Sequence, residues 1–289
     1  TRGVAIGAAL LADAVAAGVR IETGMRALGL FRDGSVPVSD GTATYPVRAR
    51  RVLIASGGKE NALAFPGWTL PGVMTAGAAQ TFCNVHCVLP AERPVMAGSG
   101  NVGLIVSYQL IHAGADMRGI IEIQDRTGGY EVHAAKIRRS GIPFYLNTKI
   151  IRAFGDNRVE GIEIEDITTG GRKTIETDGI FLSVGLTPRT ELPKMFGCSL
   201  VYEAALGGFL PRHDADMRTS MASVFIAGDS AGIEEANTAL DEGRLAGVAA
   251  AADCGYIPSE EAEREKGEIR QRLKELRRGK AGEIRALGE

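Results

Sequence analysis

Three glycines at positions 98, 100 and 103 have the spacing with the most specific chemistry in the sequence. Their segment, GSGNVG, follows the apolar run RPVMA and precedes LIVSYQLIHAG, which is typical of a packed helix. In such a strand, loop and helix, the first glycine permits a tight turn, the second lets a pyrophosphate approach the backbone, and the third lets helix and strand pack closely. The helix N-terminus directs amide groups at the phosphates. The residues predicted to hold a dinucleotide are Gly98, Ser99, Gly100, Asn101, Val102 and Gly103.

Glu122 ends the next predicted strand, MRGIIEI, about 20 residues after the last of these glycines, which is the usual separation in dinucleotide-binding units. A carboxylate there can accept hydrogen bonds from both ribose hydroxyls and repels a 2'-phosphate. A single arginine, Arg126, follows it instead of a basic cluster. The pattern therefore predicts NAD rather than NADP. The alternative is a structural glycine turn beside a surface glutamate.

The elements around this motif alternate between strand and helix. Residues 4–17 predict a helix, VRIETG (19–24) a strand, and YPVRARRVLIASGG (45–58) a β-rich segment that ends at glycines. After a helix at 130–141, hairpin strands are predicted between residues 142 and 185, with turns at Gly155-Asp156 and Gly170-Gly171. VFIAGDSAG (224–232) then runs an apolar strand into a second glycine turn and a helix that starts near Glu235. The alternation predicts an α/β fold.

Composition excludes several classes of function. The 289 residues suffice for about two domains. Charged residues make up 24% and the net charge is -2, so no nucleic acid partner is expected. The apolar runs are too short to cross a membrane, so we expect a cytoplasmic protein without membrane insertion. From Ser259 onward the sequence predicts a charged helix with a thin apolar stripe (Ile269, Leu273, Leu276), which is either mostly solvated or docks a partner.

The cysteines and histidines do not form a metal-ligand pattern. Cys83 and Cys87 are spaced to share one helix face, and we expect two small buried thiols rather than a redox or metal pair. Cys198 and Cys254 stand alone. Solvent-exposed or packing roles are expected for the histidines, which are His86, His112, His133 and His213.

Four long stretches together resemble a known family: RRVLIASGGKENALAFPGWTLPGVMTAGAAQTFCNV, GSGNVGLIVSYQL, GGYEVHAAKIRRSGIP and VFIAGDSAGIEEANTALDEGRLAG. They are similar to the FAD- and NAD-dependent pyridine nucleotide disulfide oxidoreductase superfamily. Within it they resemble most the alpha subunits of heteromeric sarcosine oxidase and of related dye-linked proline dehydrogenases. The resemblance extends to about Tyr256.

The resemblance implies two Rossmann-like dinucleotide-binding domains of three layers, with the NAD domain inserted in an FAD domain. We expect an FAD-type domain over residues 1–90 and 190–256, an NAD domain over 91–189 and a charged helical tail over 257–289. By resemblance, Gly57 borders the crossover from the FAD domain, Gly228 and Asp229 bind the flavin, and Gly185 lies near NAD. The helix after Glu235 would direct its positive end at the flavin.

The implied activity is hydride transfer between NAD(H) and FAD, with no side chain acting as a catalytic acid or base. The implied partner is a second flavoprotein subunit that oxidises an amine or amino acid, and an iron–sulfur component is also compatible. Two rival interpretations remain open. One is a thioredoxin-reductase-like enzyme with Cys83 and Cys87 as its dithiol, and the other is a non-catalytic NAD-binding subunit that stabilises an assembly.

Two departures from the family pattern qualify these expectations. The N-terminal strand and glycine loop that would wrap the FAD diphosphate have no counterpart, so we expect an incomplete FAD site in a truncated, fragmentary or processed chain. Ile105 occupies a position where disulfide reductases of this superfamily usually carry an acidic residue.

Overall fold

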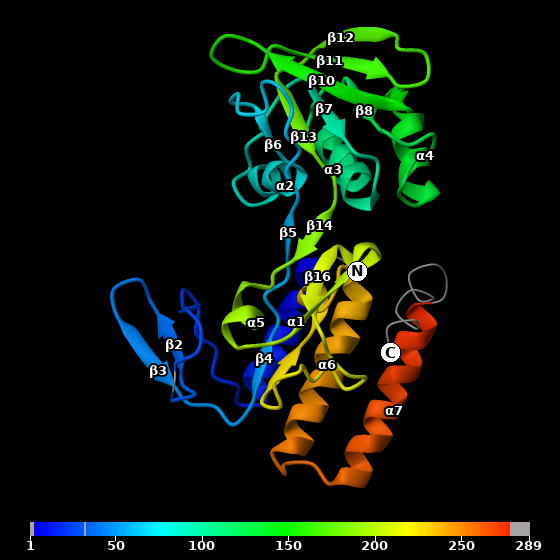
Figure 1. The fold of residues 1–289 in the computed structure, drawn as a ribbon. Helices are drawn as coiled ribbons and strands as arrows, with labels where there is room; N and C mark the ends of the chain where they lie inside the picture. Colours follow the sequence, from blue (N-terminus) through cyan, green and yellow to red (C-terminus); the bar gives the residue numbers. More distant parts are fainter. Residues whose placement is uncertain (1–2, 32, 278–289) are drawn as a thin grey trace.

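Two lobes joined by a pair of short strands make up the computed structural model, which describes residues 3–31 and 33–277 (Figure 1). The connecting strands are β5 (Gly58–Glu60) and β14 (Leu186–Pro188), which pair antiparallel. We call residues 61–185 the five-stranded lobe. The remaining described residues, before β5 and after β14, form the two-stranded lobe.

A parallel sheet is the centre of the five-stranded lobe, with the strand order β6-β13-β7-β8-β9. Its three middle strands are buried throughout, as expected for a parallel sheet covered on both faces. The strands are β6 (Val73–Thr75), β7 (Pro94–Ala97), β8 (Gly119–Ile121), β9 (Phe144–Tyr145) and β13 (Gly179–Leu182).

Alternation along these strands divides the core into two halves. Met96 packs into an apolar cluster with the helices, whereas its neighbours Val95 and Ala97 pack into a second cluster with an antiparallel sheet. The helices are α2 (Ala76–Asn84), α3 (Asn101–His112) and α4 (Glu131–Arg139). The antiparallel strands are β10 (Thr148–Phe154), β11 (Gly161–Asp166) and β12 (Arg172–Glu176). The lobe therefore has three layers, as the family resemblance implied.

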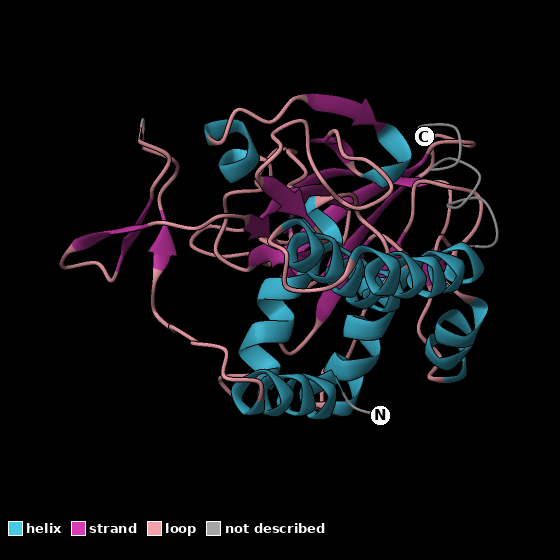
Figure 2. Ribbon diagram, turned by 90° about the horizontal axis from the view of Figure 1, so that it is seen from below, coloured by secondary structure: helices cyan, strands magenta, loops and turns pink. Residues whose placement is uncertain are grey.

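The two-stranded lobe is built on the parallel pair β4 (Val52–Ile54) and β17 (Val224–Ile226). Two long helices, α6 (Ala236–Asp253) and α7 (Ser259–Leu276), lie side by side beside this pair (Figure 1). The smaller elements are α5 (Glu191–Met195), the hairpin β15 (Leu200–Glu203) and β16 (Gly208–Pro211), and the meander β1 (Arg26–Ala27), β2 (Val36–Ser39) and β3 (Thr44–Val47). The meander projects to one side of the molecule (Figure 2), and Val36 of β2 is buried in the core of this lobe.

Three expectations differ from the structure. VRIETG at 19–24 forms no strand, and its apolar residues Val19 and Ile21 are exposed. Residues 73–84 belong to the five-stranded lobe because β6 pairs with β13, although we expected a boundary at residue 90. We therefore propose a domain division at β5 and β14.

The third difference concerns α7, which is charged but not a solvated tail. Ile269 and Leu273 are buried in the same cluster as Leu245 of α6 and Phe225 of β17. Leu276, the last residue of the expected stripe, is 45% exposed. One face of α7 therefore completes the core of the two-stranded lobe. Residues 278–289 of the predicted tail lie outside the described residues.

Helix α1 (Gly3–Ala16) differs from α7, because it is apolar in sequence but exposed in the structure. Its sequence, GVAIGAALLADAVA, is mostly apolar, but no residue of it is buried. Val4, Leu11 and Val15 are each more than half exposed. Exposed apolar surface of this kind is typical of a site that contacts another protein or element.

The packing of α7 predicts a contrast between two leucines of the same helix. Leu273→Ala should lower the free energy of unfolding by about 2 to 5 kcal/mol, because it leaves a cavity in the core. Leu276→Ala, the matched control, should change it by less than about 0.5 kcal/mol. Urea denaturation of both variants tests this, and equally small losses would show that α7 is not part of the core.

Candidate functional site

Close backbone contacts fix the glycine loop between β7 and α3. Gly98 has φ +102°, and a Cβ atom there would overlap the carbonyl oxygen of Ser183 at the end of β13. A Cβ at Gly103 would overlap the carbonyl oxygen of Gly98. At Gly100 a Cβ would meet nothing within 4 Å. Gly98 and Gly103 are therefore required by the fold itself, whereas Gly100 leaves open space over the backbone, as the approach of a pyrophosphate would require.

The carboxylate of Glu122 lies directly beneath this loop and is 9% exposed. Its Oε2 accepts hydrogen bonds from the backbone N–H (2.9 Å) and the hydroxyl (2.6 Å) of Ser99, and its Oε1 accepts one from the Gln124 N–H (3.0 Å). A carboxylate has about four acceptor positions. We expected Glu122 to serve two ribose hydroxyls, but the protein's own donors already use three positions, which leaves room for one.

The segment after β8 contacts the glycine loop. The sequence analysis did not predict this contact. The Gly128 N–H donates to the Ser99 hydroxyl (3.0 Å), and the Tyr130 N–H donates to the Asn101 side-chain oxygen (2.8 Å). A Cβ at Gly129 would lie 2.9 Å from the Asn101 nitrogen. The paired glycines in DRTGGY were the available signal, because consecutive glycines often mark a close backbone approach.

On the other lobe, the predicted flavin-side residues gather at the carboxyl ends of β4 and β17. These strands run parallel with Ile54 opposite Ile226, so the turns that follow them are neighbours. Gly57 (φ +73°) and Gly228 (φ +69°) both adopt left-handed backbone. A Cβ at Gly58 would lie 3.6 Å from the Cβ of Asp229. The structure thus brings Gly57, Gly228 and Asp229 together.

Asp229 has an unusual electrostatic environment. Burial raises the pKa of its carboxyl, a backbone hydrogen bond from Glu234 opposes that shift, and the negative charges of Glu234 and Glu235 raise the pKa further. Its carboxylate therefore lies in an acidic, partly desolvated environment. Hydroxyl groups that donate hydrogen bonds to this carboxylate, such as those of a polyol, would stabilise its charged form.

One contact joins the two lobes at the site. The Asn101 side-chain amide, at the start of α3, donates to the carboxylate of Glu235, the N-cap residue of α6 (3.1 Å). The N-termini of these two helices therefore face each other. Gly185 (φ +105°) is the last residue of the five-stranded lobe, next to β14, and its carbonyl accepts from the N–H of Asn61, the first residue of that lobe (3.0 Å).

The cysteines differ from expectation. Helix α2 ends at Asn84, so Cys87 is exposed, has φ +54° and does not share a helix face with Cys83. Cys83 is half-buried, and burial raises the pKa of its thiol. A raised pKa disfavours the thiolate that dithiol chemistry requires.

The remaining titratable candidates do not converge. His112 packs edge-on against Tyr108 (4.4 Å between ring centroids), and the His213 Nδ1 lies 2.9 Å from the Pro211 carbonyl oxygen. Ile105 is half-buried in α3. Across residues 3–31 and 33–277, no three His, Cys, Asp or Glu side chains meet as a metal site would require. Within the same residues, no helix is both long and apolar enough to cross a membrane.

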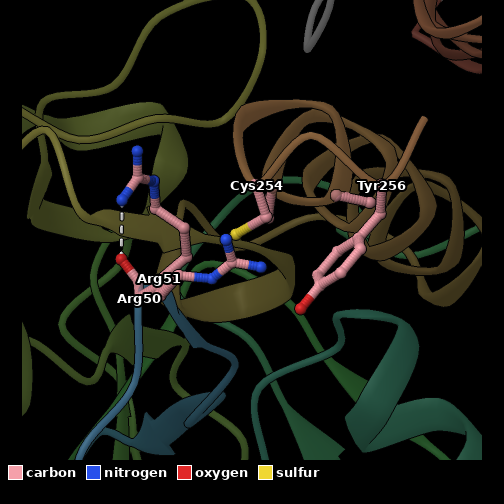
Figure 3. A pocket seen from close by; sticks show the side chains of 6 residues that line it. Arg50, Arg51, Cys254 and Tyr256 are labelled. Atoms are coloured by element: carbon pink, nitrogen blue, oxygen red, sulfur yellow. Dashed lines mark hydrogen bonds between the residues drawn. The ribbon is translucent and has the colours of Figure 1, made fainter. Parts of the chain in front are cut away.

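A separate surface pocket of about 310 Å³ lies at the other end of α6 (Figure 3). The Arg50 guanidinium stacks over the Tyr256 ring at 4.8 Å, and Arg51 donates to the Arg50 carbonyl oxygen (2.7 Å). Cys254 also lines it. Since α6 has 18 residues, its two ends are about 27 Å apart, so this pocket is not part of the candidate site.

Comparison with known proteins identifies the fold and the family. A family model described as pyridine nucleotide-disulphide oxidoreductase matches residues 10–243. An opine oxidase subunit of Rhizobium meliloti is 32% identical over 239 residues, which cover 77% of this chain and 45% of that protein. The alpha subunit of sarcosine oxidase from Corynebacterium sp. is 24% identical over 73% of this chain and 22% of its own length.

Among solved structures, thioredoxin reductase of T. acidophilum superposes with a TM-score of 0.71 and 26% identity, covering 86% of this chain and 80% of that one. The chain spans less than half the length of either curated relative. The predicted α/β fold of Rossmann type is confirmed. The chain belongs to the pyridine nucleotide-disulphide oxidoreductase family, whose members are FAD-binding, NAD(P)H-dependent oxidoreductases, as its sequence had indicated.

Proposed function

We propose that this chain is the nucleotide-binding part of a flavoprotein subunit that passes hydride between NAD(H) and FAD. The single observation that carries the proposal is the contact between Asn101 and Glu235. It places α3, which follows the glycine loop, opposite α6, which follows the turn at Gly228 and Asp229. We call this second turn the flavin-side turn. Two cofactors bound at these turns would meet between the lobes.

The proposed NAD site uses the residues of the glycine loop. The open space over Gly100 admits the pyrophosphate, and the N-terminus of α3 supplies amides and partial positive charge. Glu122 has one acceptor position for a ribose hydroxyl and would repel a 2'-phosphate. These features support NAD over NADP.

The proposed FAD site is half complete. The turns at Gly57 and Gly228 and the N-terminus of α6 fit a flavin dinucleotide, and Asp229 can accept hydrogen bonds from ribityl hydroxyls. In the described chain β4 pairs with β17 on one edge only, and α1 exposes its apolar residues. We infer that a further nucleotide-binding βαβ unit adds its strand to the free edge of β4 and covers α1.

When bound, NAD and FAD supply the redox chemistry, and the protein's own residues bind, orient and shield them. None of the site residues is assigned as a catalytic acid or base. The work of the chain is to hold the two cofactor sites at a fixed separation, since correct positioning can supply much of a rate enhancement.

The names of the two curated relatives support a place in a heteromeric enzyme, because each is a named component of an oxidase. We propose that the partner is a second flavoprotein subunit that oxidises an amine or amino acid, with an iron–sulfur component compatible, in a cytoplasmic assembly. The thioredoxin reductase likeness concerns the fold. The dithiol interpretation loses support from the placement of Cys83 and Cys87.

The NAD site predicts a loss of affinity from two single substitutions. Gly100→Val should abolish NAD binding without unfolding the chain, because its side chain enters open space that the pyrophosphate needs. Glu122→Ala should weaken binding by about 1 to 3 kcal/mol, through the lost ribose contact and the freed Ser99 donors. Calorimetric titration measures both, with exposed Glu131→Ala as the control. Wild-type affinity in either variant would remove the site from this account.

The thiols predict no catalytic effect. In an FAD-loaded protein extended at its N-terminus by a βαβ unit of a relative, replacing Cys83 and Cys87 together by alanine should leave NADH-dependent reduction of an artificial dye near the wild-type rate. Stopped-flow measurement of dye reduction tests this, beside a titration of NAD binding. Lost turnover with unchanged NAD binding would favour the disulfide-reductase interpretation instead.

The half-complete FAD site predicts that Asp229 matters only when the site is whole. In a protein extended at its N-terminus by a βαβ unit of a relative, Asp229→Ala should weaken FAD binding by about 1.5 to 3 kcal/mol, the range for a charge-assisted hydrogen bond. Flavin fluorescence titration measures the loss, with Asp166→Ala on the other lobe as the control. Unchanged FAD affinity would place the ribityl chain elsewhere.

A further inference from the structure

The end of α7 brings a guanidinium to the flavin-side turn from a distant part of the sequence. Arg277, the C-cap residue of α7, is 15% exposed in its side chain and contacts two carboxylates. Its Nη2 lies 2.9 Å from Glu234 Oε2 and 2.5 Å from Glu242 Oε1, and its Nε lies 3.1 Å from Glu234 Oε1. The side chains of Glu234 and Glu242 are only 7% and 1% exposed.

Both carboxylates depend on compensation for their burial. Removing an ionised carboxylate from water costs several kcal/mol unless opposite charge and hydrogen bonds replace its hydration. The planar fork of arginine suits this role, because it donates to two carboxylates at once in a fixed geometry. Arg277 supplies such donors to both glutamates.

The same glutamates contact the flavin-side turn, which we propose binds the flavin. The second oxygen of Glu242 accepts the Gly228 N–H at 2.8 Å. Glu234 precedes α6, and its backbone N–H bonds to Asp229. Arg277 is therefore linked to Gly228 through Glu242 by two consecutive hydrogen bonds and lies beside the segment that faces Asp229.

We propose that Arg277 is a positioning residue for the flavin-side turn, acting through Glu242 on Gly228 and through Glu234 on the surroundings of Asp229. The role of this turn in binding flavin rests on the function proposed above. Without Arg277, the charge of Glu242 draws its carboxylate toward water and away from the Gly228 N–H. Negative charge also accumulates beside Asp229, which disfavours an anionic dinucleotide.

The first test needs no cofactor. Arg277→Gln should speed hydrogen–deuterium exchange of the Gly228 amide in the present chain by at least roughly tenfold, because its local hydrogen bond opens more often. The matched control is Arg272→Gln, which removes an ion pair between the same two helices, with Asp241 (3.1 Å), but leaves Gly228 untouched. Equal exchange at Gly228 in wild type and Arg277→Gln overturns the proposal.

A rescue experiment separates positioning from general loss of packing. The triple variant Arg277→Gln, Glu234→Gln, Glu242→Gln should restore slow exchange, because a neutral amide oxygen still accepts the Gly228 N–H and needs no cation. Exchange in the triple variant as fast as in Arg277→Gln contradicts the proposal. If Arg277→Gln does not fold, Arg277→Lys replaces it and should give intermediate exchange, since charge remains but the fork is lost.

A flavin measurement completes the test. In the N-terminally extended protein, Arg277→Gln should weaken FAD binding by roughly tenfold, which corresponds to about 1.4 kcal/mol, and Arg272→Gln should not. Unchanged FAD affinity in Arg277→Gln overturns the link to flavin. If the wild-type extended protein fails to bind FAD, the proposed function is wrong, whereas the exchange experiment still reports on Arg277 separately.

Discussion

The tight approach of the glycine loop to the end of β13 is the constraint on which the rest of the site depends. Gly98 lies against the Ser183 carbonyl, and Gly103 lies against Gly98, so no side chain fits at either position. This contact sets the height of α3 above the sheet. It thereby positions Ser99 over Glu122 and Asn101 opposite Glu235. A shift in this loop would move both the proposed NAD site and the contact between the lobes.

The two lobes differ in how far they complete their own sites. The five-stranded lobe has a sheet covered on both faces, and its glycine loop is supported by β13, Glu122 and the segment around Gly129. Within the described residues, the two-stranded lobe has a free edge on β4 and an apolar α1 with no buried residue. The proposed NAD site therefore resides within one lobe, whereas the proposed FAD site needs another element.

Sequence patterns predicted the elements that local chemistry specifies. The glycine spacing, the strand before it and Glu122 place the loop correctly, because Gly98 and Gly103 each answer a local steric demand, whereas Gly100 leaves space open. VRIETG was predicted as a strand and is not one, since alternation alone does not supply a pairing partner. Cys87 was assigned to a helix that ends three residues earlier.

Long-range ion pairs were beyond reach for a different reason. Arg277 meets Glu234 and Glu242 only because α7 folds back along α6. A charged helix allows many pairings of glutamate with arginine, and the sequence alone does not rank them. Burial decides among them. The thin apolar stripe at Ile269 and Leu273 was the available signal that α7 packs inward.

The central claim is that this chain contains a whole NAD site and part of an FAD site. Calorimetric titration of one purified sample of the chain, first with NAD and then with FAD, tests it most directly. The account predicts saturable binding of one NAD per chain and no saturable binding of FAD. Stoichiometric FAD binding, or no NAD binding by the folded chain, would contradict it.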